Sequence, residues 1–187
     1  MSLPQETDKP LLRKQVAGRF KVYDRQMLAD WSERITEKIE QSEWFAQARK
    51  IACFYSLDDE VGTHKLIKNW ASRKEVFLPV ILDDNQMELR RFVPNSELRF
   101  NRFNIPEPTQ GGCCEIEDID LFLVPGVAFD RSFYRLGRGK GYYDRLLATT
   151  TAKKVGLCFD FQLFDTIPHA PHDIKMDAVV TPEEVVR

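Results

Sequence analysis

The sequence lacks the features that mark several classes of protein. Its 187 residues contain no apolar run of about twenty residues, so no membrane-spanning helix is expected. Residues 1–8 are polar and acidic and lack the basic and apolar segments of a secretory signal. The 27 Lys and Arg residues nearly balance the 29 Asp and Glu residues. This balance argues against a sequence-independent nucleic-acid binder, which would present a basic face.

Cysteine is also scarce, with only four residues. Cys53 and Cys158 fall in apolar runs and are predicted to be reduced core residues. The adjacent Cys113 and Cys114 do not have the spacing of zinc ligands. A reducing cytoplasm is the simplest setting for such a chain.

The apolar residues are arranged in alternating helical and strand patterns. Met27, Trp31, Ile35 and Ile39 recur every four residues and predict one apolar helix face. Further helices are predicted at residues 8–21, 61–73 and 141–150. Strands are predicted at residues 51–55, 76–82, 87–92, 121–124, 154–159 and 177–181. This alternation predicts an α/β fold whose mostly parallel sheet is covered on both faces.

The ends and the middle of the chain are expected to be less regular. Residues 1–7 are predicted to be a flexible tail ahead of a single domain at residues 8–187. Residues 94–118 hold three prolines and two glycines, and are predicted to be mainly loop.

Residues 135–145 are the most informative segment. Between a predicted strand and a predicted helix lie, in order, Gly137, Arg138, Gly139, Lys140 and Gly141. Alternating glycines let the backbone turn tightly and expose its N–H groups. A helix N-terminus adds further N–H groups and partial positive charge. Together with the two cations, these features are suited to holding a polyphosphate.

The loop does not match the common nucleotide motifs. It lacks the residue spacing of a Walker A loop. Its third glycine also stands at the wrong distance from the second for the dinucleotide-binding fingerprint. A structural turn with solvated cations is the alternative, but the density of charge at Arg135, Arg138, Lys140 and Arg145 favours phosphate. Asp144, in the first helical turn, either stabilises the helix end or binds Mg²⁺.

Residues 124–130 and 135–145 closely resemble the 5-formyltetrahydrofolate cyclo-ligases, also called 5,10-methenyltetrahydrofolate synthetases. The resemblance continues in residues 9–13, 55–60, 63, 87 and 104–108, and in a C-terminal block with matches at residues 155–157, 162–163, 168, 172–173 and 179–181. Phe133 and Asn104 depart from it, because the family usually has Gly at both places. Asn tolerates positive φ, whereas Phe tolerates it poorly, so the turn before Arg135 is expected to differ in shape.

The resemblance implies a fold and a reaction. The fold would be a single-domain three-layer sandwich like those of sugar-phosphate isomerases and CoA-transferases. The reaction would be the ATP-dependent cyclisation of 5-formyltetrahydrofolate, with or without a polyglutamate tail, to 5,10-methenyltetrahydrofolate. The protein would be a cytoplasmic ligase of one-carbon metabolism, a monomer or weak homodimer, with no nucleic-acid or membrane partner.

The resemblance also implies roles for individual residues. ATP would be bound by Lys9, Arg13, Arg135, Leu136, Gly137, Arg138, Gly139, Lys140, Gly141, Tyr142 and Tyr143. Lys140 and Arg138 would be catalytic, stabilising charge on the transferring phosphoryl group. Asp144 and Asp173 would hold Mg²⁺. Folate would be bound by Tyr55, Glu60 and Tyr142.

Other functions remain open. A sugar-phosphate isomerase or acyl-transfer enzyme of similar architecture would need phosphate binding but no Mg²⁺, and the acidic pair Asp144 and Asp173 speaks against it. A nucleotide- or folate-binding homologue without turnover is the second alternative. The presence of Lys140, Asp144 and Glu60 speaks against that alternative.

Overall fold

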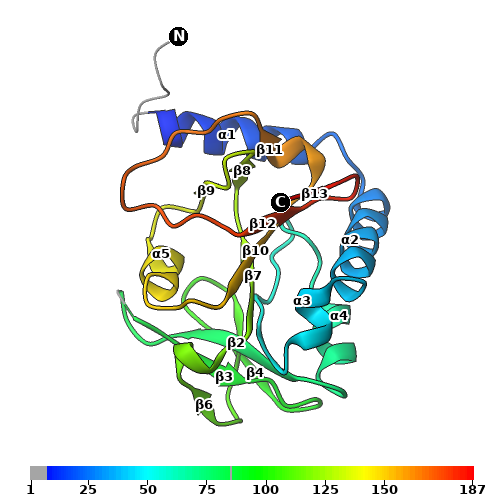
Figure 1. Ribbon diagram of the computed structural model, residues 1–187, viewed down its shortest axis with the longest axis vertical. Coiled ribbons are helices and arrows are strands. Elements are labelled where there is room, and N and C mark those ends of the chain that lie inside the picture. The colour runs from blue at the N-terminus through cyan, green and yellow to red at the C-terminus, as the bar shows by residue number, and fades with distance from the viewer. Residues whose placement is uncertain (1–7, 85) are drawn as a thin grey trace.

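A central eight-stranded sheet runs through the protein (Figure 1). The computed structural model describes residues 8–84 and 86–187, so the predicted tail at residues 1–7 lies outside the described residues. In chain order the sheet contains β1 (Lys50–Ala52), β2 (Glu75–Ile81), β3 (Met87–Arg91), β6 (Cys113–Cys114), β7 (Leu121–Pro125), β10 (Lys153–Leu157), β12 (Ala178–Val180) and β13 (Val185–Val186). Its spatial order is β13-β12-β10-β7-β1-β2-β3-β6.

The middle of this sheet is parallel. Strands β12, β10, β7, β1 and β2 pair in parallel, and β13, β3 and β6 add antiparallel strands at the two edges. The predicted mostly parallel sheet is therefore confirmed. Parallel strands need crossover connections, which here carry the helices to the two faces.

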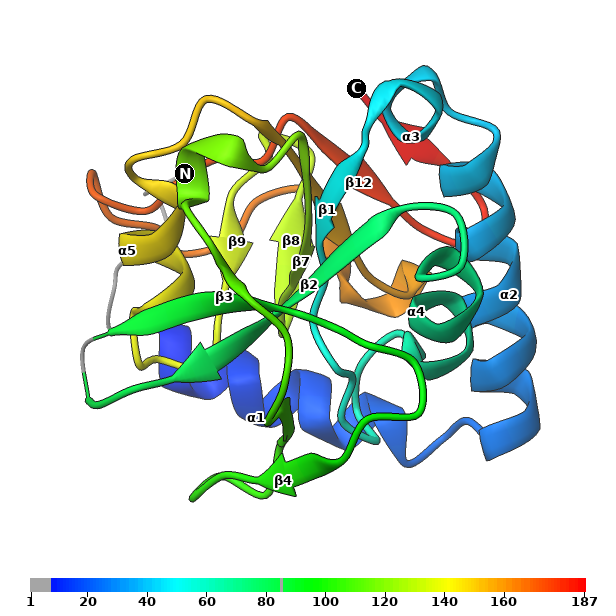
Figure 2. The ribbon, with the colours of Figure 1, turned by 90° about the horizontal axis from the view of Figure 1, so that it is seen from below.

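The helices lie on both faces of the sheet. They are α1 (Lys9–Phe20), α2 (Arg25–Glu40), α3 (Glu43–Gln47), α4 (His64–Trp70) and α5 (Tyr142–Leu147), with short 3₁₀ turns η2 (Ile116–Asp118) and η3 (Asp160–Gln162). Figure 2 shows α2, α3 and α4 on one side of the sheet and α5 on the other, with α1 along one end. No helix among the described residues has the length and apolar character needed to cross a membrane.

Alternation along the strands builds the two cores. In β1, Ile51 joins the cluster that packs against α2, α3 and α4, whereas Ala52 joins the cluster that packs against α5. In β7, Leu121 and Leu123 face the first cluster and Phe122 the second. Successive side chains of a strand point to opposite faces, so continuous apolar runs mark strands buried on both sides.

Helix α2 has the predicted apolar face. The Asp24 carboxylate caps its first turn by accepting the amide of Met27 at 2.8 Å. Ile35 and Ile39 are fully buried, whereas Met27 is 40% exposed and lies at the rim of the face.

Two regions differ from the prediction. The segment at residues 94–118 contains an antiparallel pair, β4 (Leu98–Phe100) and β5 (Pro106–Pro108), in addition to β6. Proline has no N–H group to donate to a neighbouring strand, and it is tolerated here because both strands of the pair are edge strands. A second, three-stranded sheet of β8 (Ala128–Asp130), β9 (Arg135–Leu136) and β11 (Leu163–Phe164) was not predicted, because its strands are too short to show a period.

Candidate active site

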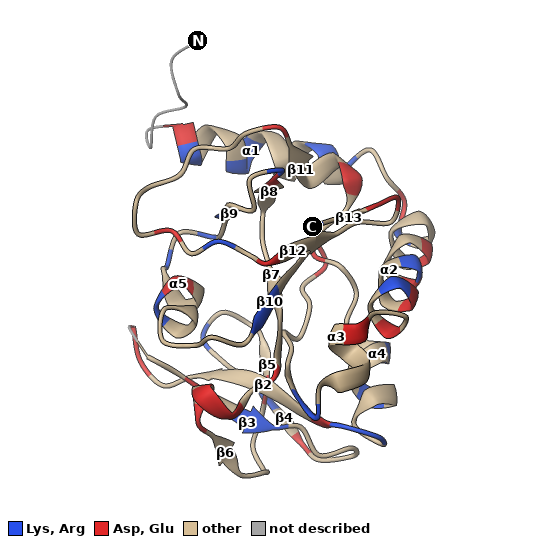
Figure 3. Ribbon diagram, in the orientation of Figure 1, with Lys and Arg blue, Asp and Glu red and all other residues tan. Residues whose placement is uncertain are grey.

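The glycine loop (residues 137–141) joins β9 to α5, and Figure 3 shows cationic residues on this loop and along α1. Gly139 has a φ of 95° and Gly141 a φ of 70°, so both occupy the left-handed region that favours glycine. Gly141 is also the N-cap of α5, which has only six residues. So short a helix aligns few peptide dipoles, and the side-chain cations supply most of the positive charge.

Helix α1 carries two of the predicted cations, and one of them, Arg13, contacts the loop. Arg13 Nε donates to the carbonyl oxygen of Gly137 at 2.9 Å, and a Cβ at Gly139 would lie 3.3 Å from Arg13 Nη2. Partial burial lowers the pKa of Arg13 below its ordinary value. Lys9 Nζ lies 2.7 Å from Asp173 Oδ2. Both contacts join residues more than 120 positions apart in the sequence, and the contact of Arg13 lies at the glycine loop.

Arg135 lies beneath the glycine loop. Its side chain is only 4% exposed, and Nη2 contacts Asp144 Oδ1 at 2.9 Å. Nη1 donates to the carbonyl oxygen of Pro125 at 3.4 Å, and the buried Nε has no hydrogen-bond partner within the described part of the chain. The guanidinium is thus directed toward Asp144.

Leu136 and Tyr143 also point inward. Leu136 is 2% exposed and packs with Leu12 and Val16 of α1, so only its backbone faces the loop. The Tyr143 ring lies against the Arg135 guanidinium at 5.6 Å. Burial and the negative charge of Glu60 raise the pKa of the Tyr143 phenol.

Tyr142 and Lys140 make contacts of a different kind. The Tyr142 hydroxyl accepts from Arg102 Nη2 at 2.9 Å and donates to the carbonyl oxygen of Asp83 at 2.8 Å. It thereby links the loop to the segments that follow β2 and β4. Lys140 is exposed, and its carbonyl oxygen accepts from Arg145 Nη2 at 3.1 Å.

Glu60 is one of the most buried acids of the site. Its side chain is 11% exposed, with Oε1 3.2 Å from Arg138 Nη2. Oε2 accepts the amide of Leu57 at 2.9 Å. Burial raises the pKa of Glu60, and the Leu57 amide and Arg138 only partly oppose this effect. Asp59, which was not predicted from the sequence, binds the same Arg138 Nη2 at 2.5 Å.

Tyr55 lies at the start of the same segment. Its ring stacks on the His64 ring with centroids 4.0 Å apart, and His64 Nε2 lies 2.9 Å from the carbonyl oxygen of Ser56. The buried Thr63 hydroxyl donates to the carbonyl oxygen of Phe54 at 2.6 Å. These bonds fasten the segment that carries Glu60.

A cavity of about 230 Å³ lies between α1, the glycine loop and the segment that carries Asp59. It is lined among others by Arg13, Val16, Phe20, Asp59, Val127 and Arg138. Its walls combine apolar surface with cations, which suits a ligand that has both a planar apolar part and an anionic part.

The two predicted metal ligands are each paired with a cation, Asp144 with Arg135 and Asp173 with Lys9. Over residues 8–84 and 86–187, no three or more His, Cys, Asp or Glu side chains are grouped to hold a metal ion. Magnesium commonly takes one or two protein carboxylates and completes its shell with phosphate oxygens and water. Asp144 uses Oδ1 for Arg135 and makes no hydrogen bond through Oδ2 to the residues that the structure describes, so it fits such an ion.

Phe133 occupies the turn before Arg135 with a φ of 71°. Phenylalanine therefore does not push this turn out of the left-handed conformation, contrary to the expected change of shape. The Asp130 carboxylate holds the turn by accepting the amides of Ser132 and Tyr134 at 2.9 Å. Asn104, at the other departure, has a φ of 59°, which asparagine tolerates.

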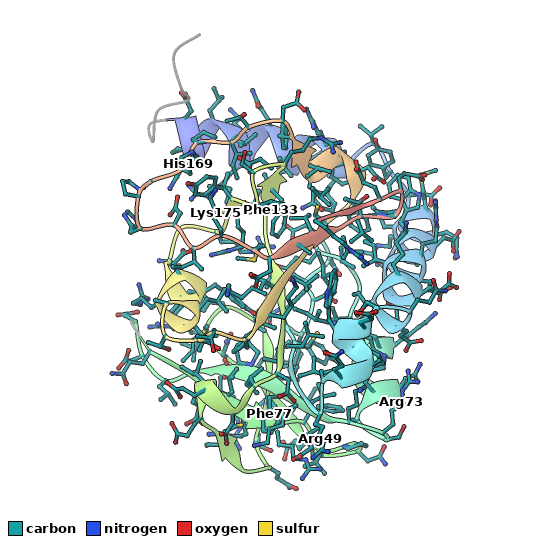
Figure 4. All side chains as sticks on the ribbon, in the orientation of Figure 1. Arg49, Arg73, Phe77, Phe133, His169 and Lys175 are labelled. Carbon is teal, nitrogen blue, oxygen red and sulfur yellow. The ribbon has the colours of Figure 1, made fainter. Side chains whose placement is uncertain are left out.

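Figure 4 shows Phe133 near His169 and Lys175, below α1. The His169 ring stacks on Tyr134 with centroids 3.7 Å apart, and Lys175 Nζ lies 4.4 Å from the centroid of the same ring. These contacts hold the segment that carries Asp173.

A second hollow, of about 610 Å³, lies near Arg49 and Arg73 at the other end of the protein (Figure 4). Two of the cations that line it have structural partners. Arg73 pairs with Glu40, and Lys74 Nζ donates to carbonyl oxygens at the end of α3. These contacts explain Arg73 by ion pairing and Lys74 by helix capping.

Comparisons with known proteins identify the family of this chain. The model of the 5-formyltetrahydrofolate cyclo-ligase family matches residues 5–182. A 5-formyltetrahydrofolate cyclo-ligase of Escherichia coli (strain K12) is 37% identical over 146 residues, which cover 74% of this chain and 80% of that protein. A mitochondrial 5-formyltetrahydrofolate cyclo-ligase of Arabidopsis thaliana is 31% identical and covers 95% of this chain and 75% of its own.

The solved structures give the same result. The structure of Aquifex aeolicus 5,10-methenyltetrahydrofolate synthetase superposes with a TM-score of 0.88 at 35% identity, covering 96% of this chain and 92% of that chain. The expected three-layer α/β fold and the family resemblance are both confirmed. The chain belongs to the 5-formyltetrahydrofolate cyclo-ligase family.

Proposed function

We propose that the protein converts 5-formyltetrahydrofolate and ATP to 5,10-methenyltetrahydrofolate, ADP and phosphate. The observation that carries this proposal is the contact of Arg138 with Glu60 at 3.2 Å. This contact joins the loop suited to phosphate to the carboxylate suited to a pterin. Both reactants would therefore bind within reach of each other, as phosphoryl transfer requires.

The chemistry begins at the formyl oxygen, which is a poor leaving group. This oxygen attacks the γ-phosphorus of ATP, and the bond from that phosphorus to the ADP oxygen breaks. N10 of the substrate then attacks the activated formyl carbon and loses its proton. The carbon–oxygen bond breaks and releases inorganic phosphate, which leaves the closed ring.

The cations around the glycine loop would bind and stabilise the phosphates. Lys9 and Arg13 would approach from α1, and the backbone of residues 135–143 would follow the phosphate chain. Arg138 and Lys140 would neutralise charge on the phosphoryl group during transfer. The exposure of Lys140 supports this role, because an exposed ammonium group can turn toward a ligand without breaking a buried contact.

The folate would lie against the segment that carries Glu60. A pterin presents adjacent N–H groups, and a carboxylate can accept both of them. The rings of Tyr55 and Tyr142 would provide stacking surface or hydrogen bonds. A polyglutamate tail on the substrate is part of the proposal and can be tested by comparing substrates.

Asp144 and Asp173 would hold Mg²⁺ together with phosphate oxygens. The ion would help to neutralise the negative charge of the phosphates. Arg135 would orient the Asp144 carboxylate toward it, and Lys9 would do the same for Asp173. In this proposal two ligand carboxylates are each positioned by a neighbouring cation.

We also propose that the protein acts in the cytoplasm as a monomer or weak homodimer. Its four cysteines are free, which supports a reducing compartment. Light scattering over a range of protein concentrations tests the oligomeric state.

The reaction is tested by mixing the protein with 5-formyltetrahydrofolate and MgATP and following methenyl-folate absorbance and ADP release. Lys140→Ala should lower turnover by roughly 100-fold or more, whereas the exposed Lys68→Ala on α4 should leave it unchanged. Chelation of Mg²⁺ should abolish turnover. Substrate binding without product would identify a sequestering protein instead, and failure to bind folate would refute the proposal.

A further inference from the structure

Arg138 lies between two carboxylates from a distant segment. Its Nη2 contacts Asp59 Oδ1 at 2.5 Å and Glu60 Oε1 at 3.2 Å. These acids precede Arg138 by 79 and 78 residues. The glycine loop is thus fastened to the segment that carries Glu60, through a single guanidinium group.

The two acids differ in their access to water. The Asp59 side chain is 45% exposed and can be hydrated when it loses its partner. The Glu60 side chain is 11% exposed, and both of its oxygens are engaged, Oε1 by Arg138 and Oε2 by the Leu57 amide. Withdrawal of Arg138 would leave a buried charge without its cation, which is strongly unfavourable.

We propose that Asp59 is a positioning residue that holds Arg138 on Glu60 in the free protein, so that nucleotide and folate share one contact to break and each strengthens the binding of the other. This inference rests on the proposed function. Phosphates that take Arg138 leave Glu60 Oε1 open to the N–H donors of a pterin. A pterin on Glu60 in turn releases Arg138 to the phosphates.

The binding of nucleotide and the binding of folate are coupled because both ligands break the same contact. The ligand that binds first breaks the contact between Arg138 and Glu60, and the second ligand binds a site in which it is already broken. Thermodynamic linkage requires that folate raise the affinity for nucleotide by the same factor by which nucleotide raises the affinity for folate. Coupled sites commonly differ about 5- to 150-fold in affinity between the two conditions, and we expect a value in this range.

The effect of Asp59→Asn on nucleotide affinity distinguishes two possible roles of Asp59. If Asp59 holds Arg138 away from the phosphates, Asp59→Asn tightens nucleotide binding to the folate-free protein. If Asp59 only orients Arg138 toward the phosphates, the same change weakens nucleotide binding.

The experiment measures the Kd of a non-hydrolysable ATP analogue with Mg²⁺ by calorimetry, with and without saturating 5-formyltetrahydrofolate. The wild-type protein should bind the analogue about fivefold or more tightly when folate is present. Asp59→Asn should bind the analogue more tightly without folate and show a smaller ratio of the two Kd values. The matched control is Asp58→Asn, since Asp58 is 99% exposed and lies 3.9 Å from Arg25. It should leave both Kd values unchanged.

Two results would overturn the inference while the proposed function stands. One is a wild-type protein that turns over but binds the analogue equally well with and without folate. The other is weaker nucleotide binding by Asp59→Asn. A wild-type protein that binds no folate would overturn the proposed function and this inference with it.

Discussion

A Cβ atom at Gly137 would lie 2.5 Å from Nη1 of Arg135. The absence of a side chain at Gly137 is therefore what lets the Arg135 guanidinium lie beneath the loop. Gly126 also leaves room for this side chain, since a Cβ added at Gly126 would lie 3.1 Å from Arg135 Cγ. Glycine in this motif gives room to a buried arginine as well as freedom to the backbone.

Gly137→Ala should displace the Arg135 guanidinium and so misplace the Asp144 carboxylate. Loss of a group that orients a metal ligand commonly lowers metal affinity or activity about 10- to 100-fold, and we expect a decrease of this size in kcat/KM at limiting Mg²⁺. The control is Gly18→Ala in α1, where a Cβ would meet nothing within 4 Å. Gly18→Ala should retain activity and gain about 0.5–1 kcal/mol of stability. Full activity of Gly137→Ala would show that Arg135 does not position Asp144.

Arg135→Met should leave Asp144 without its cation. Breaking a buried ion pair from one side commonly costs about 3–5 kcal/mol, and the partial exposure of Asp144 places this pair at the lower end. Chemical denaturation would measure the loss. The double variant Arg135→Met with Asp144→Asn should recover part of the lost stability, because neither charge then remains unpaired. If the two losses simply add, the pair is not coupled.

The ion pair of Lys9 and Asp173 should give a pH-dependent stability. Burial opposes ionisation of Asp173, but the bonds from Lys9 and the Ala170 amide outweigh it, and the pKa falls below its ordinary 3.8. A depressed pKa stabilises the folded state above pH 3.8, and this stabilisation is lost as pH falls through the folded value.

Asp173→Asn should therefore have a lower Tm than wild type at neutral pH, and the difference should shrink below pH 3.8. The control on the same segment is Asp165→Asn, because Asp165 is 99% exposed and its ion pair with Arg131 spans 3.7 Å. Exposed pairs contribute little. A difference that persists unchanged into acid would assign the effect of Asp173 to packing.

Glu60 should show the opposite pH dependence. Because burial raises its pKa above the ordinary 4.5, the folded state binds its proton more tightly than the unfolded state does. Stability then falls as pH rises from 4.5 through the folded value. Glu60→Gln should have a higher Tm at neutral pH but bind folate more weakly. A lower Tm would show that the bonds of the carboxylate to Arg138 and the Leu57 amide outweigh its burial.

The sequence predicted the site best where the functional residues are neighbours in the chain. The glycine loop combines backbone freedom with charge, and both properties are visible in residue types at Gly139 and Gly141. Helix α1 could be placed beside it only through the family resemblance, because no local pattern links Arg13 to Gly137. The long-range contact itself is visible only in the folded chain.

Asp59 illustrates what the sequence did not reveal. It is one of several acids in a loop, and nothing in the spacing distinguishes it from Asp58. Its partner Arg138 lies 79 residues away, and only the fold brings them together. The three-stranded sheet was missed for a related reason, since Arg135 and Leu136 form a strand too short to show alternation.

Phe133 offers a test of backbone strain. Its φ of 71° suits glycine, and a non-glycine residue in the left-handed region costs about 1–2 kcal/mol. Phe133→Ala loses the partly buried ring and keeps the strain, whereas Phe133→Gly loses the ring and relieves it. Phe133→Gly should therefore be more stable than Phe133→Ala by about 1 kcal/mol.

At most positions the order is reversed, because glycine has greater freedom in the unfolded chain. Phe100 in β4 is 63% exposed and provides the comparison, so Phe100→Ala should be more stable than Phe100→Gly. Denaturant unfolding of the four variants gives both differences. If alanine is the more stable replacement at both positions, the turn at Phe133 relaxes when the ring is removed, and the positive φ is held by the ring and not by the bonds from Asp130.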